Sequence, residues 1–207
     1  MKKQKILILL LAVNVALVIF LANFGLVVFN ESYYVEQFGK NDVYSKVPEA
    51  ENVLENVFGF FKGKEELNSE VFKENEISHM MDVKMLINRA FYLLYFLIGL
   101  FILLVIVLVK SVKRNKAVKY IGFSLVAGGS IVVMVSLILF LLNFSNIFTN
   151  FHLIFFPQGN WVFPSGYVLI KLFPEAFFYD ISFRIVKDSV VSAVLLVMVG
   201  FYLFRRK

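Results

Sequence analysis

The 207-residue sequence contains no cysteine, so a disulfide framework, a thiol nucleophile and a thiolate metal site are all excluded. It has only two histidines, His79 and His152, and neither an H-x-x-x-H nor an H-E-x-x-H spacing. No pre-organised metal motif is therefore indicated. Walker A, dinucleotide-binding and G-x-S-x-G patterns are also missing, which argues against nucleotide chemistry and serine hydrolysis.

Charged residues are absent from four long apolar runs, in a chain that is 59% hydrophobic with a mean hydropathy of +0.77. The runs are Ile6–Phe29, Ala90–Val109, Tyr120–Asn143 and Ser189–Phe204. The first three are long enough, as helices, to cross a hydrocarbon core of about 30 Å. We expect the shorter fourth helix to begin earlier, between Ile181 and Asp188. The fold class is predicted to be an all-α membrane protein with four transmembrane helices.

Acidic residues are absent from three basic clusters that flank these runs. The clusters are Lys2, Lys3 and Lys5; Lys110, Lys113, Arg114, Lys116 and Lys119; and Arg205, Arg206 and Lys207. All 15 acidic residues lie in the segments on the opposite side. The positive-inside rule then places both chain ends in the cytoplasm of a multi-pass cell-membrane protein. The basic residues behind the net charge of +6 are then expected to face anionic lipid headgroups and to anchor the protein in the membrane. No nucleic-acid partner is expected.

These patterns divide the chain into alternating spans and connections. The predicted segments are 1–29 (cytoplasmic start and first span, a retained signal anchor), 30–89 (a small extracellular cap folded onto the membrane mouth of the bundle), 90–109 (second span), 110–119 (cytoplasmic loop), 120–143 (third span), 144–188 (aromatic-rich outer loop) and 189–207 (fourth span and cytoplasmic tail). Gly128 and Gly129 are expected to let a neighbouring helix approach, and Asn14 and Asn23 to hydrogen-bond between helices.

The two outer segments differ in composition. In the cap, Pro48 is predicted to start a helix whose apolar side includes Leu54 and Phe58, and a second helix is expected from about Ser69. Between them and the first span, Tyr33 to Phe38 mixes apolar and polar residues without a clear period. The outer loop is rich in aromatic residues, which suits an interfacial belt, but its prolines and glycines also favour a fixed, shaped loop.

His79 and His152 both lie at the outer boundary of a span, and two imidazoles near neutral pH suit acid–base catalysis. Asp82 would share a helix face with His79 and could orient it, so we favour His79 as the base. The rival interpretation is a zinc site that uses both histidines with Asp82 or Asp180. The simplest interpretation is that both histidines are amphipathic residues at the interface without a function. The other candidate binding residues are Phe151, Phe155, Phe156 and Trp161 as pocket walls, Asn160 as an oxyanion donor or turn residue, and Arg89, Asp180 and Arg184 as polar contacts or interfacial anchors.

The segments around the histidines resemble a known family. They read Ser78-His79-Met80-Met81-Asp82-Val83-Lys84, Phe151-His152-Leu153-Ile154-Phe155-Phe156, Asn160-Trp161 and Leu172-Phe173-Pro174-Glu175-Ala176-Phe177-Phe178-Tyr179-Asp180. The chain thereby resembles the lipoprotein intramolecular transacylases (Lit) of Gram-positive bacteria, which the four-span topology also fits.

The resemblance implies an acyltransferase that moves the sn-2 acyl chain of an S-diacylglyceryl cysteine to the α-amino group of the same cysteine, forming a lyso-form lipoprotein. It implies His79 and His152 as the catalytic pair, with an active site at the extracellular face. The expected partners are a diacylated lipoprotein and membrane lipids. We expect no cofactor and no metal, and a monomeric protein.

Two other functions stay open from the residues alone. A non-catalytic membrane protein could bind lipid or lipoprotein through its acidic cap. A transporter is favoured least, because the spans carry no ionisable residue.

Overall fold

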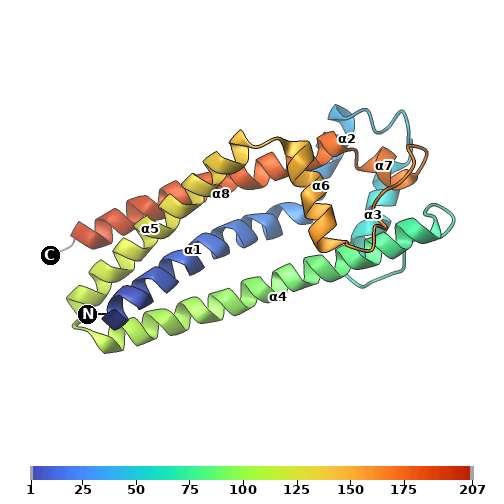
Figure 1. Ribbon diagram of the computed structural model, residues 1–207. Coiled ribbons are helices and arrows are strands. Elements are labelled where there is room, and N and C mark those ends of the chain that lie inside the picture. Colours follow the sequence, from blue (N-terminus) through green and yellow to red (C-terminus); the bar gives the residue numbers. More distant parts are fainter. Residues whose placement is uncertain (1, 206–207) are drawn as a thin grey trace. The chain divides into compact units, whose positions relative to one another are not determined.

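The computed structural model describes residues 2–205, and all regular structure there is helical (Figure 1). Arg206 and Lys207, assigned above to the C-terminal basic cluster, lie outside the described residues. The helices are α1 (Lys2–Val28), α2 (Glu31–Lys40), α3 (Ala50–Phe61), α4 (Glu74–Ser111), α5 (Arg114–Leu141), α6 (Phe144–Phe155), α7 (Val168–Leu172) and α8 (Glu175–Arg205).

Four of the helices, α1, α4, α5 and α8, are long and apolar enough to cross a membrane, which confirms the predicted fold class. Two of them extend well beyond their apolar runs. The second cap helix begins at Glu74, later than the expected start near Ser69, and it continues toward the membrane without a break to Ser111 as α4. Helix α8 begins at Glu175, directly after Pro174, and earlier than the expected start between Ile181 and Asp188.

The chain forms two compact units. The first contains the described parts of residues 1–25, 90–141 and 184–207, which include most of the four long helices. The second contains residues 26–89 and 142–183, with α2, α3, α6, α7 and the beginnings of α4 and α8.

Within the first unit, α5 approaches two neighbours through glycine. A Cβ atom added to Gly128 would lie 2.7 Å from the carbonyl oxygen of Ala12 on α1. One added to Gly122 would lie 2.7 Å from the carbonyl oxygen of Gly200 on α8, and the reverse substitution meets Gly122 at the same distance. These contacts confirm the predicted role of Gly128 and extend it to a second crossing.

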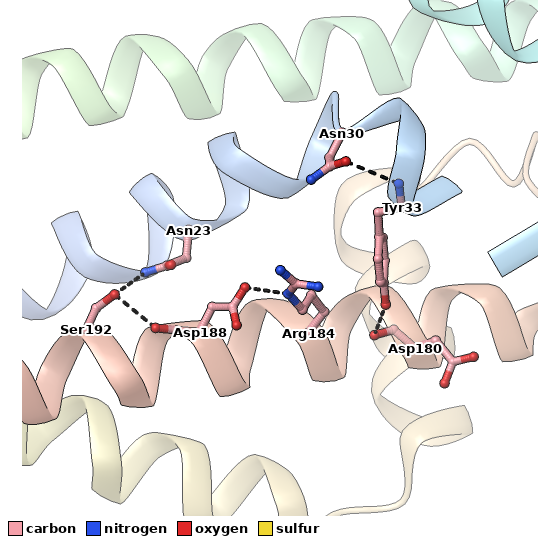
Figure 2. Close-up of polar contacts among 7 residues, drawn as sticks. All are labelled: Asn23, Asn30, Tyr33, Asp180, Arg184, Asp188 and Ser192. Carbon is pink, nitrogen blue, oxygen red and sulfur yellow. Dashed lines mark hydrogen bonds and ion pairs between the residues drawn. The ribbon is translucent and has the colours of Figure 1, made fainter. Parts of the chain in front are cut away.

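Polar side chains of α1 also join the long helices. The Asn14 amide donates to the carbonyl oxygen of Leu97 on α4 at 3.1 Å. Asn23 donates to Ile19 in its own helix at 2.8 Å and to the Ser192 hydroxyl of α8 at 3.3 Å (Figure 2). Both interhelical bonds were predicted from the sequence, and they satisfy groups that hydrocarbon would leave unpaired.

In the second unit, aromatic side chains form the core. Phe38 of α2 is fully buried, 6.1 Å from the ring of Phe177 on α8. Tyr34, one turn earlier, meets the ring of Phe58 on α3 at 5.0 Å. The segment from Tyr33 to Phe38, whose pattern showed no clear period, is thus a helix that buries one face. The helix predicted from Pro48 begins at Ala50, so the proline lies in the preceding turn.

A single buried carboxylate caps two helices of this unit. Glu76 has no exposed surface, and its two oxygens accept from different backbone amides. One accepts from Lys73 at the start of α4 at 2.9 Å, as in a capping box, and the other from Leu169 in the first turn of α7 at 2.8 Å. A negative charge at either helix start is favourable, so Glu76 fixes α7 to the beginning of α4.

We expect Gly122→Ala to destabilise the first unit by about 1–3 kcal/mol, because its methyl group meets backbone atoms of α8 that cannot move aside. Thermal unfolding in detergent, followed by far-UV circular dichroism, measures the change. Gly99→Ala on α4 is the matched control, since nothing lies within 4 Å of its added Cβ. Equal stability of the two variants would contradict the close crossing.

We expect Glu76→Ala to weaken α7 locally by about 1–3 kcal/mol, because the buried amide hydrogen of Leu169 loses its acceptor. Hydrogen exchange at the Leu169 amide should accelerate accordingly. The control is Glu74→Ala, which removes an exposed carboxylate from the same first turn. Unchanged exchange at Leu169 in the Glu76 variant would argue against this cap.

Candidate active site

The two histidines come from different helices and meet in the second unit. His79 lies in the second turn of α4, and His152 lies near the end of α6. Their ring centroids are 6.1 Å apart, with planes inclined by 27°. Both are buried, at 7% and 8% exposure. The two rings are therefore close enough to act on one small reacting centre.

Aromatic side chains surround the pair. Phe156 is almost fully buried beside both rings, 4.7 Å from His79 and 5.6 Å from His152 between centroids. Trp161 lies 4.7 Å from His152, and Phe163 lies 5.6 Å from His79. This aromatic wall excludes water from the imidazoles on the sides it covers.

The tautomer of His152 follows from its own helix. Its Nδ1 lies 2.7 Å from the backbone carbonyl oxygen of Phe148, one turn earlier. A carbonyl oxygen can only accept, so Nδ1 carries the hydrogen and donates it. In the neutral ring, Nε2 is then left with the lone pair, and it is the nitrogen that can accept a proton.

Asp82 does not bind His79 directly, in contrast to the orienting role expected from their i, i+3 spacing. Its Oδ2 accepts from Gln158 at 2.7 Å and from Asn160 at 2.7 Å. Both donors lie in the turn that follows α6, where Gly159 adopts a positive φ of 77°. Asp82 therefore ties the turn after His152 to the helix that carries His79.

The environment of the rings favours their neutral forms. Burial, followed by the nearby charge of His152, lowers the pKa of His79 to about 4, against smaller opposing effects of Asn160 and Asp82. Burial also lowers the pKa of His152, although its hydrogen bond to the Phe148 carbonyl opposes the shift. Both imidazoles are thus available as proton acceptors at neutral pH.

The remaining predicted residues divide into near and distant groups. Phe151 lies 5.6 Å from His152, and Phe155 stacks against Phe151 at 4.7 Å, half exposed at the edge of the cluster. Asp180 instead pairs with Lys40 at 2.8 Å, and its backbone oxygen accepts from Tyr33 (Figure 2).

For the two predicted arginines, the structure shows other surroundings than the histidines, and their proposed binding role stays a prediction. Arg184 belongs to the first unit, where it pairs with Asp188 one turn later in α8 (Figure 2). Arg89 lies exposed on α4, as an interfacial anchor would. Within residues 2–205, no group of three or more histidine, aspartate or glutamate side chains is arranged to hold a metal ion.

Three residues of the cluster were not singled out from the sequence. Phe148 supplies the carbonyl that fixes His152, and its i, i+4 spacing from that histidine was a usable signal. Gln158 and Phe163 reach the cluster only because the proline- and glycine-rich segment folds back, which no short-range pattern predicts.

Solved structures with the same fold come from one enzyme. The membrane-integral lipoprotein intramolecular transacylase Lit from Bacillus cereus is 19% identical, with a TM-score of 0.75 over 98% of this chain and 96% of that one. Its variant with one histidine replaced by arginine matches with a TM-score of 0.76, at 19% identity over 98% and 92%. The variant with alanine in place of that histidine matches with a TM-score of 0.74, at 18% identity, over 98% of this chain and 94% of that one. No curated protein matches the chain.

The sequence itself matches the family described as lipoprotein intramolecular transacylase Lit over residues 6–178. This range contains both histidines, the turn that Asp82 holds and all of the aromatic wall described above. The match extends over most of the chain, and the protein therefore belongs to the lipoprotein intramolecular transacylase family.

Proposed function

We propose that His79 and His152 catalyse the intramolecular acyl transfer of this family. The chain is a membrane-integral acyltransferase. Its substrate is an S-diacylglyceryl cysteine at a lipoprotein N-terminus, and the sn-2 acyl chain moves to the α-amino group of that cysteine. The observation that carries the proposal is the pair of buried imidazoles 6.1 Å apart within one aromatic cluster.

The proton balance of the reaction explains the use of two imidazoles. An α-amino group has a pKa near 7.7–8.0 in water and enters mainly as an ammonium ion. It loses two protons on becoming an amide, while the departing glycerol oxygen takes up one. Two proton-accepting rings can receive the two protons. The one that is suitably placed then protonates the alkoxide as the ester bond breaks, and the other releases its proton to solvent after the transfer.

No enzyme nucleophile is needed, because amine and ester belong to the same substrate. The barrier is then largely the cost of bringing these two groups together in a bent conformer. Phe156, Trp161 and Phe163 provide a rigid apolar surface against which that conformer can pack. The same surface keeps out water, which would hydrolyse the ester instead.

The proposal includes the membrane orientation. The basic clusters support a cytoplasmic location for both chain ends, and with it a location of the histidines at the extracellular face. A diacylated lipoprotein reaches this face laterally through the outer leaflet, among membrane lipids. Both reacting groups are on one substrate and both histidines on one chain, so a monomer suffices, and no cofactor is required.

We expect His79→Ala and His152→Ala each to reduce formation of N-acylated lyso-lipoprotein by about 10²- to 10⁴-fold, the usual contribution of a general acid or base. Mass spectrometry of a diacylated lipoprotein incubated with purified enzyme in lipid vesicles measures the product. Glu74→Ala, on the same helix but exposed, controls for handling of the variants. Full activity in both histidine variants would refute the proposal and favour a lipid-binding role.

We expect both ring titrations to lie below the ordinary histidine value of 6.5, with that of His79 near 4. Because the unfolded chain binds more protons than the folded one between those limits, stability should rise with pH through that window. Nuclear magnetic resonance of labelled histidine gives the titrations, and unfolding at several pH values gives the slope. A ring titrating above 6.5 would contradict this account of burial.

A further inference from the structure

We propose that Asn160 is the positioning residue of His79: its side-chain oxygen accepts the Nδ1 hydrogen, which leaves Nε2 to take a proton from the substrate. Asp82 in turn holds Asn160 in the orientation that this requires. The inference deepens the proposed function and rests on it, and it concerns a residue that the sequence suggested as an oxyanion donor.

The orientation of the Asn160 amide is set by the acceptor of its nitrogen. Its nitrogen lies 2.7 Å from Asp82 Oδ2, and a carboxylate can only accept, so the amide cannot be turned around. The same nitrogen makes a longer contact of 3.5 Å with the Ser78 hydroxyl. The Asn160 amide is therefore already engaged with Asp82, and Asn160 takes a positioning role in place of the oxyanion role suggested by the sequence.

Two buried polar atoms then remain without a partner in good hydrogen-bond geometry, the Oδ1 atom of Asn160 and the Nδ1 atom of His79. Leaving either atom unpaired in a buried site is unfavourable. The Asn160 amide nitrogen contacts Ser78 and Asp82, which flank His79 on α4, so the two side chains lie at the same place on that helix. With the hydrogen on Nδ1 they become donor and acceptor, whereas the other tautomer sets two acceptors together.

The accessible nitrogen of His79 is consistent with this assignment. Nδ1 is buried without a partner, whereas Nε2 is not among the buried unpaired atoms, and Nε2 is therefore the nitrogen assigned to the substrate. His152 is held in the same way, with Nδ1 donating to the Phe148 carbonyl. Both rings would then present an Nε2 lone pair, as two successive deprotonations of one ammonium require.

A neutral amide between Asp82 and His79 has a further consequence. A carboxylate bonded directly to an imidazole favours the imidazolium form and raises its pKa. Asn160 transmits the orientation set by Asp82 without placing that charge against the ring. His79 can therefore be held in one tautomer and still remain neutral in its buried site.

Ring-labelled ¹⁵N-histidine tests the proposal directly, because the chain has only two histidines. At pH 7.5 in detergent, both rings of the unaltered protein should show the Nδ1–H tautomer. In Asn160→Ala, and in the volume-preserving Asn160→Leu, the His79 signals should shift toward the Nε2–H tautomer or a mixture. The turnover number should fall about 10- to 100-fold, with a smaller change in KM.

Gln158→Ala is the matched control, since Gln158 donates to the same Asp82 oxygen from the same turn but brings no oxygen to His79. Its His79 tautomer should stay as in the unaltered protein. The His152 signals report whether the cluster is intact in every variant, because that ring is held by Phe148. An unchanged His79 tautomer in both Asn160 variants would overturn the proposal, whereas full activity of His79→Ala would overturn only the catalytic function.

Discussion

The two hydrogen bonds that Asp82 accepts from Gln158 and Asn160 connect the parts of the second unit that carry the histidines. His79 precedes Asp82 by less than one turn on α4, and the two amides follow His152 in the turn after α6. Beside these bonds, the turn makes one longer polar contact with α4, from the Asn160 amide to the Ser78 hydroxyl at 3.5 Å. The 6.1 Å separation of the imidazoles depends on an interaction that does not involve either ring.

Backbone capping supports the same arrangement from the other side. Glu76 lies one turn before His79, and its two carboxylate oxygens accept hydrogen bonds from backbone amides at the starts of α4 and α7. The segment between Asn160 and α7 is thereby attached to α4 at two places, through Asp82 and through Glu76. Phe163 lies within that segment, so its contact with His79 is fixed at both ends of a short chain.

The sequence was sufficient to predict what depends on hydropathy and local spacing. Four charge-free runs indicated the four long helices, and paired glycines and isolated asparagines indicated where those helices touch. The role of Asp82 was not predictable, because its partners lie more than 70 positions away and its helical spacing pointed to His79 instead. The segment boundary predicted before Ala90 is likewise not a break in structure, because a change from polar to apolar composition marks a boundary of environment and need not end a helix.

Recognition of the histidine pair had a different basis from recognition of the fold. Two interfacial histidines fitted a metal site, an acid–base pair or plain filler, and the family resemblance selected among them. The geometry adds what the resemblance does not contain, namely that the Phe148 carbonyl fixes the tautomer of His152 and that the Asn160 amide donates to Asp82. Those distinctions depend on single atoms, and residue patterns do not encode them.

Burial of the rings raises an energetic difficulty that the substrate itself can relieve. Moving a proton from an aqueous ammonium with a pKa near 8 to a ring with a pKa of about 4 costs roughly 5 kcal/mol, at 1.36 kcal/mol for each pKa unit. The aromatic enclosure that lowers the histidine pKa also desolvates an ammonium entering it and lowers that pKa in the same direction. Proton transfer between the two then moves one positive charge within the enclosure and creates no new one. The mismatch inside the site is consequently smaller than in water, and an apolar pocket is compatible with base catalysis by neutral imidazole.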